Sequence, residues 1–143
     1  MDASTLYLLD TNILVHYVRQ SVVWQRVSAA HAPLAVEPTP KVCLVSHGEL
    51  RSLALQWKWA DRKLKQMEFC LGYFLPVSID DPAIIEAYAA IDAYCESIGH
   101  SMGKNDLWIA ATAATIGATL ITTDRDFDRL TPQFLNRIWV DPA

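Results

Sequence analysis

Short apolar runs and segments of helical periodicity alternate along the chain. Four runs rich in apolar and β-branched residues are typical of buried strands, and they cover residues 6–9, 41–45, 76–79 and 118–123. Residues 137–140 have the pattern of a short edge strand. Apolar residues recur every three to four positions after each of the first three runs, which predicts that a helix follows each strand.

Helix boundaries are marked by residues that favour starts and ends. Second helices are predicted at residues 21–30, 60–72 and 106–116. Pro82 suits a first helical position, and Gly99 and Gly117 suit helix ends. Ser46 with Glu49 three residues later has the pattern of a capping box, which predicts a helix start at Ser46. Alternating strands and helices predict an α/β fold with a mostly parallel sheet, in which ligands bind beyond the carboxyl ends of the strands.

Acidic residues lie where the predicted strands end. Asp10 directly follows the first strand, Glu49 comes shortly after the second, and Asp124 directly follows the fourth. Asp106 opens the helix that leads into the fourth strand. Helix capping accounts for each acid taken alone, but it does not require acids at the same end of three strands. Carboxylate oxygens around a water-rich site are the ligands of Mg²⁺ or Mn²⁺, so we expect a divalent metal site. Four neighbours are expected to support the site, the first three by hydrogen bonds to the carboxylates: Thr11, Asn12, Thr122 and Asn105.

Four motifs in series resemble a known family. They are Leu-Leu-Asp-Thr-Asn-Ile-Leu at 8–14, Ser-x-x-Glu-Leu at 46–50, Asn-Asp-Leu-Trp-Ile-Ala-Ala at 105–111 and Leu-Ile-Thr-Thr-Asp-Arg-Asp-Phe at 120–127. Their order and spacing resemble a PIN domain of the VapC type, the ribonuclease toxin of bacterial toxin–antitoxin pairs. The resemblance implies a three-layer α/β/α sandwich with sheet order 3-2-1-4-5 and a metal-dependent endoribonuclease.

The resemblance also implies a set of metal-binding acids. Carried over by motif, the first three acids of the family fall on Asp10, Glu49 and Asp106. The fourth is Asp124 or Asp126, and Asp124 ranks first because it ends the strand, whereas Asp126 can turn away or act one step removed from the metal. Many relatives carry another acid where this chain has Asn105, so one or two ions are both compatible with the ligand set.

Composition and charge narrow the possible substrates. The 143 residues are 52% hydrophobic and 20% charged, which predicts one folded domain over residues 1–143 and excludes a disordered chain. Twelve basic and 16 acidic residues give a net charge of −4. This charge argues against a protein that binds nucleic acid through an overall positive surface. Without the five candidate acids, the net charge of the remaining residues is nearly neutral. The negative charge is therefore concentrated in the candidate site, where a bound metal ion would offset it. Five basic residues shortly after Glu49 are expected to guide RNA to the site: Arg51, Lys58, Arg62, Lys63 and Lys65. The alternative is that they form a solvent-exposed helical face with no such role.

Neither the cysteines nor the apolar stretches of the sequence indicate disulfides or a membrane segment. Cys43, Cys70 and Cys95 lie far apart and predict buried thiols. The longest mostly apolar stretch, residues 107–121, is too short to span a bilayer. The first residues lack the basic and apolar regions of a secretory signal, which predicts a cytoplasmic protein.

A second apolar stripe follows the second predicted strand. Four residues there recur at helical spacing and are expected to face the core: Leu50, Leu53, Ala54 and Trp57. Trp59 would lie about 200° from Trp57 on a helix, and Leu55 is four residues before it. Leu55 and Trp59 therefore form a second apolar stripe, which packs on the predicted helix at 60–72 or meets a second copy of the protein or a bound peptide. The family resemblance favours a protein–protein surface that includes Leu55 and Trp59. The family resemblance implies two such surfaces, an antitoxin groove and a homodimer contact, and favours the groove.

Other α/β classes fit less well. A haloacid-dehalogenase phosphatase needs a second aspartate where Asn12 stands, and a receiver domain needs an acid pair near the first strand, where only Asp10 is found. No glycine-rich dinucleotide fingerprint follows any strand. The alternative that remains open is a catalytically silent PIN fold that binds RNA or protein.

Overall fold

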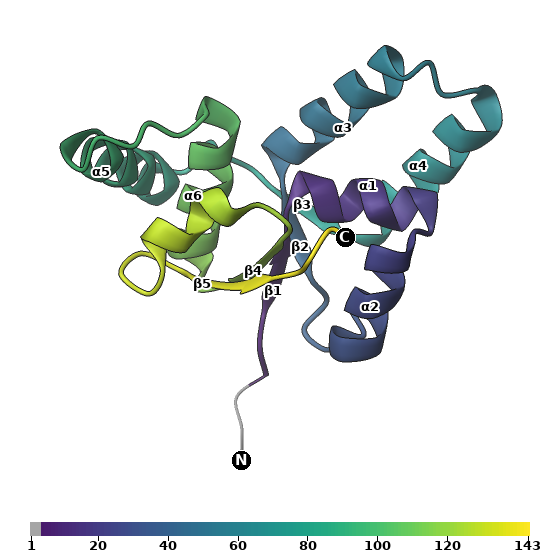
Figure 1. Cartoon of the computed structure of the whole chain (residues 1–143), viewed down its shortest axis with the longest axis horizontal. Coiled ribbons are helices and arrows are strands. Elements are labelled where there is room, and N and C mark those ends of the chain that lie inside the picture. Colours follow the sequence, from purple (N-terminus) through teal and green to yellow (C-terminus); the bar gives the residue numbers. More distant parts are fainter. Residues whose placement is uncertain (1–3) are drawn as a thin grey trace.

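A computed structural model describes residues 4–143 of the chain (Figure 1). In chain order the elements are β1 (Tyr7–Leu9), α1 (Thr11–Arg19), α2 (Val22–His31), β2 (Lys41–Cys43), α3 (Leu44–Gln56), α4 (Asp61–Tyr73), β3 (Leu75–Val77), α5 (Pro82–Ser97), α6 (Lys104–Ile116), β4 (Thr119–Thr122), the 3₁₀ helix η1 (Arg125–Leu130) and β5 (Asn136–Trp139). The predicted alternation of strands and helices is confirmed.

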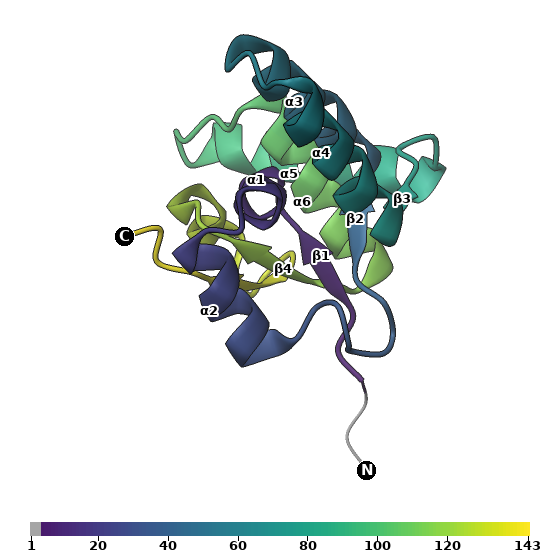
Figure 2. The same ribbon diagram turned by 90° about the vertical axis from the view of Figure 1, so that its right-hand side faces the viewer.

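The five strands form one parallel sheet in the order β3-β2-β1-β4-β5. Alternate residues of the strands point to opposite faces, so Leu8 and Leu120 pack with α5 and α6, whereas Leu9 and Ile121 pack with α1 and α4. Figures 1 and 2 show these helices on the two sides of the sheet. The three-layer α/β/α sandwich and the strand order expected from the resemblance are confirmed.

Most helix ends follow the predicted signals. Pro82 opens α5, where the Asp81 side chain accepts a hydrogen bond from the backbone N–H of Ala83. Gly117 ends α6 with φ of 68°, in the left-handed region that favours glycine.

The expected capping box at Ser46 and Glu49 is wrong. The chain passes from β2 directly into α3, which begins at Leu44, so Ser46 lies inside the first turn. Its buried hydroxyl is 2.9 Å from the Thr11 hydroxyl, instead of capping its own helix. The helix starts earlier than predicted because no loop separates it from β2, which ends at Cys43.

The expectation that Trp57 faces the core is also wrong. Leu50 and Ala54 are buried as predicted, but α3 ends at Gln56 and Trp57 is 42% exposed. Lys58 adopts φ of 54° and reverses the chain, and the Trp59 N–H then donates to the Ala54 carbonyl at 3.0 Å. Helical periodicity therefore does not reach Trp59, whose partly buried ring packs against the α1–α4 side of the core.

Within residues 4–143 no helix is both long and apolar enough to cross a membrane. Cys43, Cys70 and Cys95 are buried, as predicted. The expectation about a secretory signal rests partly on residues 1–3, which lie outside the described part of the chain.

Candidate metal centre

Asp10 forms the deepest part of an acidic site at the carboxyl edge of the sheet. It caps α1 directly after β1 and is only 3% exposed. The Thr11 backbone N–H donates to Asp10 Oδ1 at 2.8 Å, and the Thr122 hydroxyl donates to Oδ2 at 2.7 Å. Both carboxylate oxygens are thus held in place by the ends of β1 and β4, and the predicted support from Thr122 is present.

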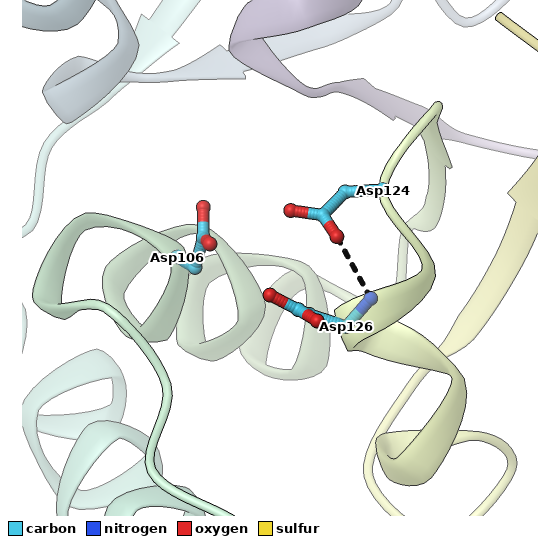
Figure 3. A group of neighbouring side chains, drawn as sticks. All are labelled: Asp106, Asp124 and Asp126. Atoms are coloured by element: carbon cyan, nitrogen blue, oxygen red, sulfur yellow. Dashed lines mark hydrogen bonds between the residues drawn. The ribbon is translucent and has the colours of Figure 1, made fainter.

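Three more aspartates converge beside it. One carboxylate oxygen from each of Asp106, Asp124 and Asp126 lies within 4.8 Å of the other two. Figure 3 shows the three side chains directed toward a common space from α6 and from the start of η1. Asp124 caps η1 by accepting the Asp126 backbone N–H at 2.8 Å, which places the two carboxylates next to each other.

Glu49 reaches the same region from α3. Its carboxylate accepts a hydrogen bond from the Thr11 hydroxyl at 2.6 Å. Thr11 therefore links the second motif to the first, and Ser46 lies against the same hydroxyl. The sequence analysis missed this role of Ser46, although its position three residues before Glu49 on one helix was a signal.

Burial and neighbouring negative charges raise the pKa values of Asp10 and Asp106. Burial, and then the charges of Glu49 and Asp124, raise the pKa of Asp10 to about 6 against the lowering effect of its hydrogen bonds. Burial, and then the charges of Asp10 and the other site acids, raise the pKa of Asp106 to about 7. In residues 4–143 no lysine or arginine forms an ion pair with these acids. An oxygen-lined site with uncompensated negative charge fits a divalent cation.

Two predicted supporting residues form no hydrogen bond with the acids. Asn12 and Asn105 are exposed, and across residues 4–143 neither side chain hydrogen bonds to a site carboxylate. Asn105 instead lines a hollow next to Glu49.

The five basic residues expected to guide RNA lie apart from the acids. Arg51 is two positions from Glu49 and so about 200° round α3, where it forms an ion pair with Glu68 of α4. Lys65 lines the same side of the molecule as Arg51, and the Lys63 ammonium lies 5.2 Å from the Trp59 ring centroid. Lys58 and Arg62 belong to the connection and the first turn of α4. Their role toward RNA stays a prediction.

Arg125 is a cation beside the site that the sequence analysis overlooked. It lies between Asp124 and Asp126, and its guanidinium carbon is 3.6 Å from the Trp139 ring centroid. It also contacts Asp128 at 3.3 Å. Its position between two candidate ligands was the signal available in the sequence.

Comparisons with known proteins show the family of the chain. The family model described as PIN domain matches residues 7–131. Ribonuclease VapC1 of Haemophilus influenzae (strain R2866) is 27% identical over 129 residues, which cover 88% of this chain and 92% of that protein.

Two solved structures share the fold. VapBC2 from Rickettsia felis, bound to a promoter DNA fragment, has a chain that superposes with a TM-score of 0.80 at 22% identity, covering 96% of this chain and 100% of that one. A chain of VapBC-5 from Mycobacterium tuberculosis, a member of the VapBC family of toxin–antitoxin systems, gives a TM-score of 0.70 at 21% identity, covering 95% and 99%. Because the family model matches most of the sequence, the chain belongs to the PIN domain family.

Proposed function

We propose that this protein is a metal-dependent endoribonuclease that acts as the toxin of a type II toxin–antitoxin pair. The observation that carries the proposal is the convergence of acids from four separate segments on one edge of the sheet. Its relative VapC1 is a ribonuclease by name, and the fold is shared with members of toxin–antitoxin complexes.

The proposed cofactor is Mg²⁺ or Mn²⁺, as one or two ions. The donors are carboxylates without histidine or cysteine, which suits hard cations that keep part of their water shell. When bound, such an ion supplies an activated water and stabilises the charge that develops during phosphodiester cleavage. The residues that would hold it are Asp10, Glu49, Asp106, Asp124 and Asp126.

The roles of these residues follow from their surroundings. Asp10 is buried and held at both oxygens, so it serves as the rigid anchor of the site. Asp124 and Asp126 are adjacent, and we assign both to the site, Asp124 as the more buried of the two. Thr11 keeps the Glu49 carboxylate turned toward Asp10. A bound divalent ion would also offset the negative charge of these carboxylates, which would otherwise repel an RNA phosphate.

Growth inhibition tests the proposed function directly. We expect the wild-type protein expressed alone to arrest growth, and Asp106→Asn at equal protein level to relieve the arrest, because the variant loses a site carboxylate. Mapping new RNA ends in the arrested cells shows whether RNA is the target. Equal growth of wild type and variant would contradict the toxin assignment and favour a catalytically silent PIN fold.

An apolar groove between α3 and α4 is the proposed contact for an antitoxin segment. Its volume is about 490 Å³, and its lining includes Leu55, Leu64 and Met67. Leu55 is 77% exposed, so its apolar side chain is accessible to a partner at the edge of this groove. Trp59 packs mainly within the chain, so Leu55 carries more of the predicted surface. The homodimer contact stays a prediction.

We expect Leu55→Asp to weaken co-purification with a co-expressed antitoxin by about tenfold or more, because the variant replaces an apolar contact with a charge that must lose its water on binding. Ile85→Asp on α5 introduces the same charge at an exposed position on the other side of the sheet and serves as the control. Equal recovery of the antitoxin with both variants would place the partner elsewhere.

A further inference from the structure

Two adjoining hollows extend from the acidic site along α3. The inner one, of about 280 Å³, is bounded by Asp106, Lys104 and Glu49. The outer one, of about 390 Å³, shares Glu49 and Asn105 with the inner one and continues to Gln56. Because they share two lining residues, they form one continuous groove between α3 and the start of α6, which we call the α3–α6 groove.

Apart from Glu49 at its inner end, the outer part of this groove is lined by neutral residues, several of which can form hydrogen bonds. Gln56 donates to the Ser52 hydroxyl at 2.9 Å, which leaves the Gln56 carbonyl oxygen and the Ser52 hydroxyl proton available. The exposed Asn105 amide faces the same hollow, and Val45 and Leu53 add apolar surface. Such a lining suits an uncharged planar ring with polar edges better than a phosphate.

Gly48 keeps the groove open. It lies in the interior of α3, where glycine costs about 1 kcal/mol relative to alanine. A Cβ atom at this position would meet no atom within 4 Å, so packing does not require a glycine here. Gly48 lines the outer hollow, and a longer side chain would project into it. The groove is the feature that benefits from this glycine.

We propose that the α3–α6 groove holds a nucleobase of the substrate RNA next to the scissile phosphate, and that Gln56 and Asn105 select that base through its hydrogen-bonding edge. The inference rests on the proposed ribonuclease function. The groove begins at Asp106 and Glu49, so a base bound in it leaves its adjoining phosphate at the acids. Lys104 at this inner end is placed to contact that phosphate.

Gly48→Met tests the proposal by filling the groove, and Gly72→Met, the same change at an exposed glycine of α4 outside the groove, is the matched control. Each purified variant is incubated with a mixed-sequence RNA and Mn²⁺, cleavage ends are mapped, and Mn²⁺ binding is measured separately. We expect Gly48→Met to raise KM about tenfold or more, since base contacts of this kind contribute that much, while Mn²⁺ binding is unchanged. Gly72→Met should stay close to wild type in KM and in cleavage sites.

Gln56→Leu supplies a second test that does not depend on filling space. It retains the size of the side chain and removes its polar atoms, so we expect an altered distribution of bases at the cleavage site with the fold retained. Wild-type cleavage with unchanged sites and KM in both Gly48→Met and Gln56→Leu would overturn the groove proposal while the ribonuclease function stands. Absence of RNA cleavage by the wild type would overturn both. Loss of antitoxin co-purification with unchanged cleavage would assign the groove to a protein segment instead.

Discussion

Asp10→Asn is expected to lower metal-dependent RNA cleavage by more than about 100-fold without unfolding the protein. Residues that only support a metal ligand already contribute 10- to 100-fold, and Asp10 is itself a proposed ligand, buried next to the other acids. The amide has nearly the same shape as the carboxylate and retains an oxygen for the Thr11 N–H. It removes the charge that would hold the cation.

The measurement is cleavage of an RNA substrate with Mg²⁺ or Mn²⁺ and with a chelator, alongside circular dichroism. Asp80→Asn makes the same chemical change at an exposed residue on the loop before α5, and we expect it to retain wild-type cleavage. Near-wild-type cleavage by Asp10→Asn would contradict the metal-site proposal. Cleavage of equal rate in the chelator would contradict metal dependence itself.

Metal-free stability should fall as pH rises, and Asp106→Asn should reverse much of that fall. The pKa of Asp106 is raised to about 7, so the folded state holds its proton more tightly than the unfolded chain. This contribution to stability is complete below about pH 4 and is lost as pH rises through about 7. At pH 8 the ionised carboxylate destabilises the folded state. Because Asp106 is partly exposed to water, we expect Asp106→Asn to be more stable by about 1–2 kcal/mol at that pH.

Urea unfolding in a chelator at pH 5 and pH 8 measures this difference. Burial lowers the pKa values of His16 and His47, and comparing variant with wild type at each pH cancels their contribution. Adding Mg²⁺ at pH 8 should stabilise the wild type more than the variant, because ligand binding to the folded state alone raises its stability. A variant less stable than the wild type at pH 8 without metal would show that the acids do not repel one another.

Substitutions in the α3–α6 groove and substitutions of the metal-binding acids should change RNA cleavage in different ways. Changes at Asp10 or Asp106 should affect every RNA equally, because they act on the chemical step. Changes at Gly48 or Gln56 should affect RNAs differently, because they act on one base. Comparing cleavage-site distributions of the two classes of variant distinguishes these roles within a single experiment.

Hydrophobic periodicity along the chain determined the order of strands and helices. The alternation of buried runs with helical segments leads to a parallel sheet, since short right-handed crossovers allow few other arrangements. The carboxyl ends of parallel strands meet at one edge, and this is why acids as distant as Asp10 and Asp124 could be expected at a common site. These features depend on local patterns and on topology, both of which the sequence carries.

Several side-chain contacts depend on where a helix begins or where the chain reverses, and only the tertiary structure determined these contacts. Ser46 contacts Thr11 because α3 starts at Leu44, and Trp57 is exposed because Lys58 reverses the chain after α3. The proximity of both Asp124 and Asp126 to Asp106 depends on the 3₁₀ turn that follows β4. The hollow next to Gly48 likewise forms only because Asn105 at the start of α6 lies close to α3 in the folded protein. Contacts of this kind join segments far apart in the chain, and no local pattern specifies their distances.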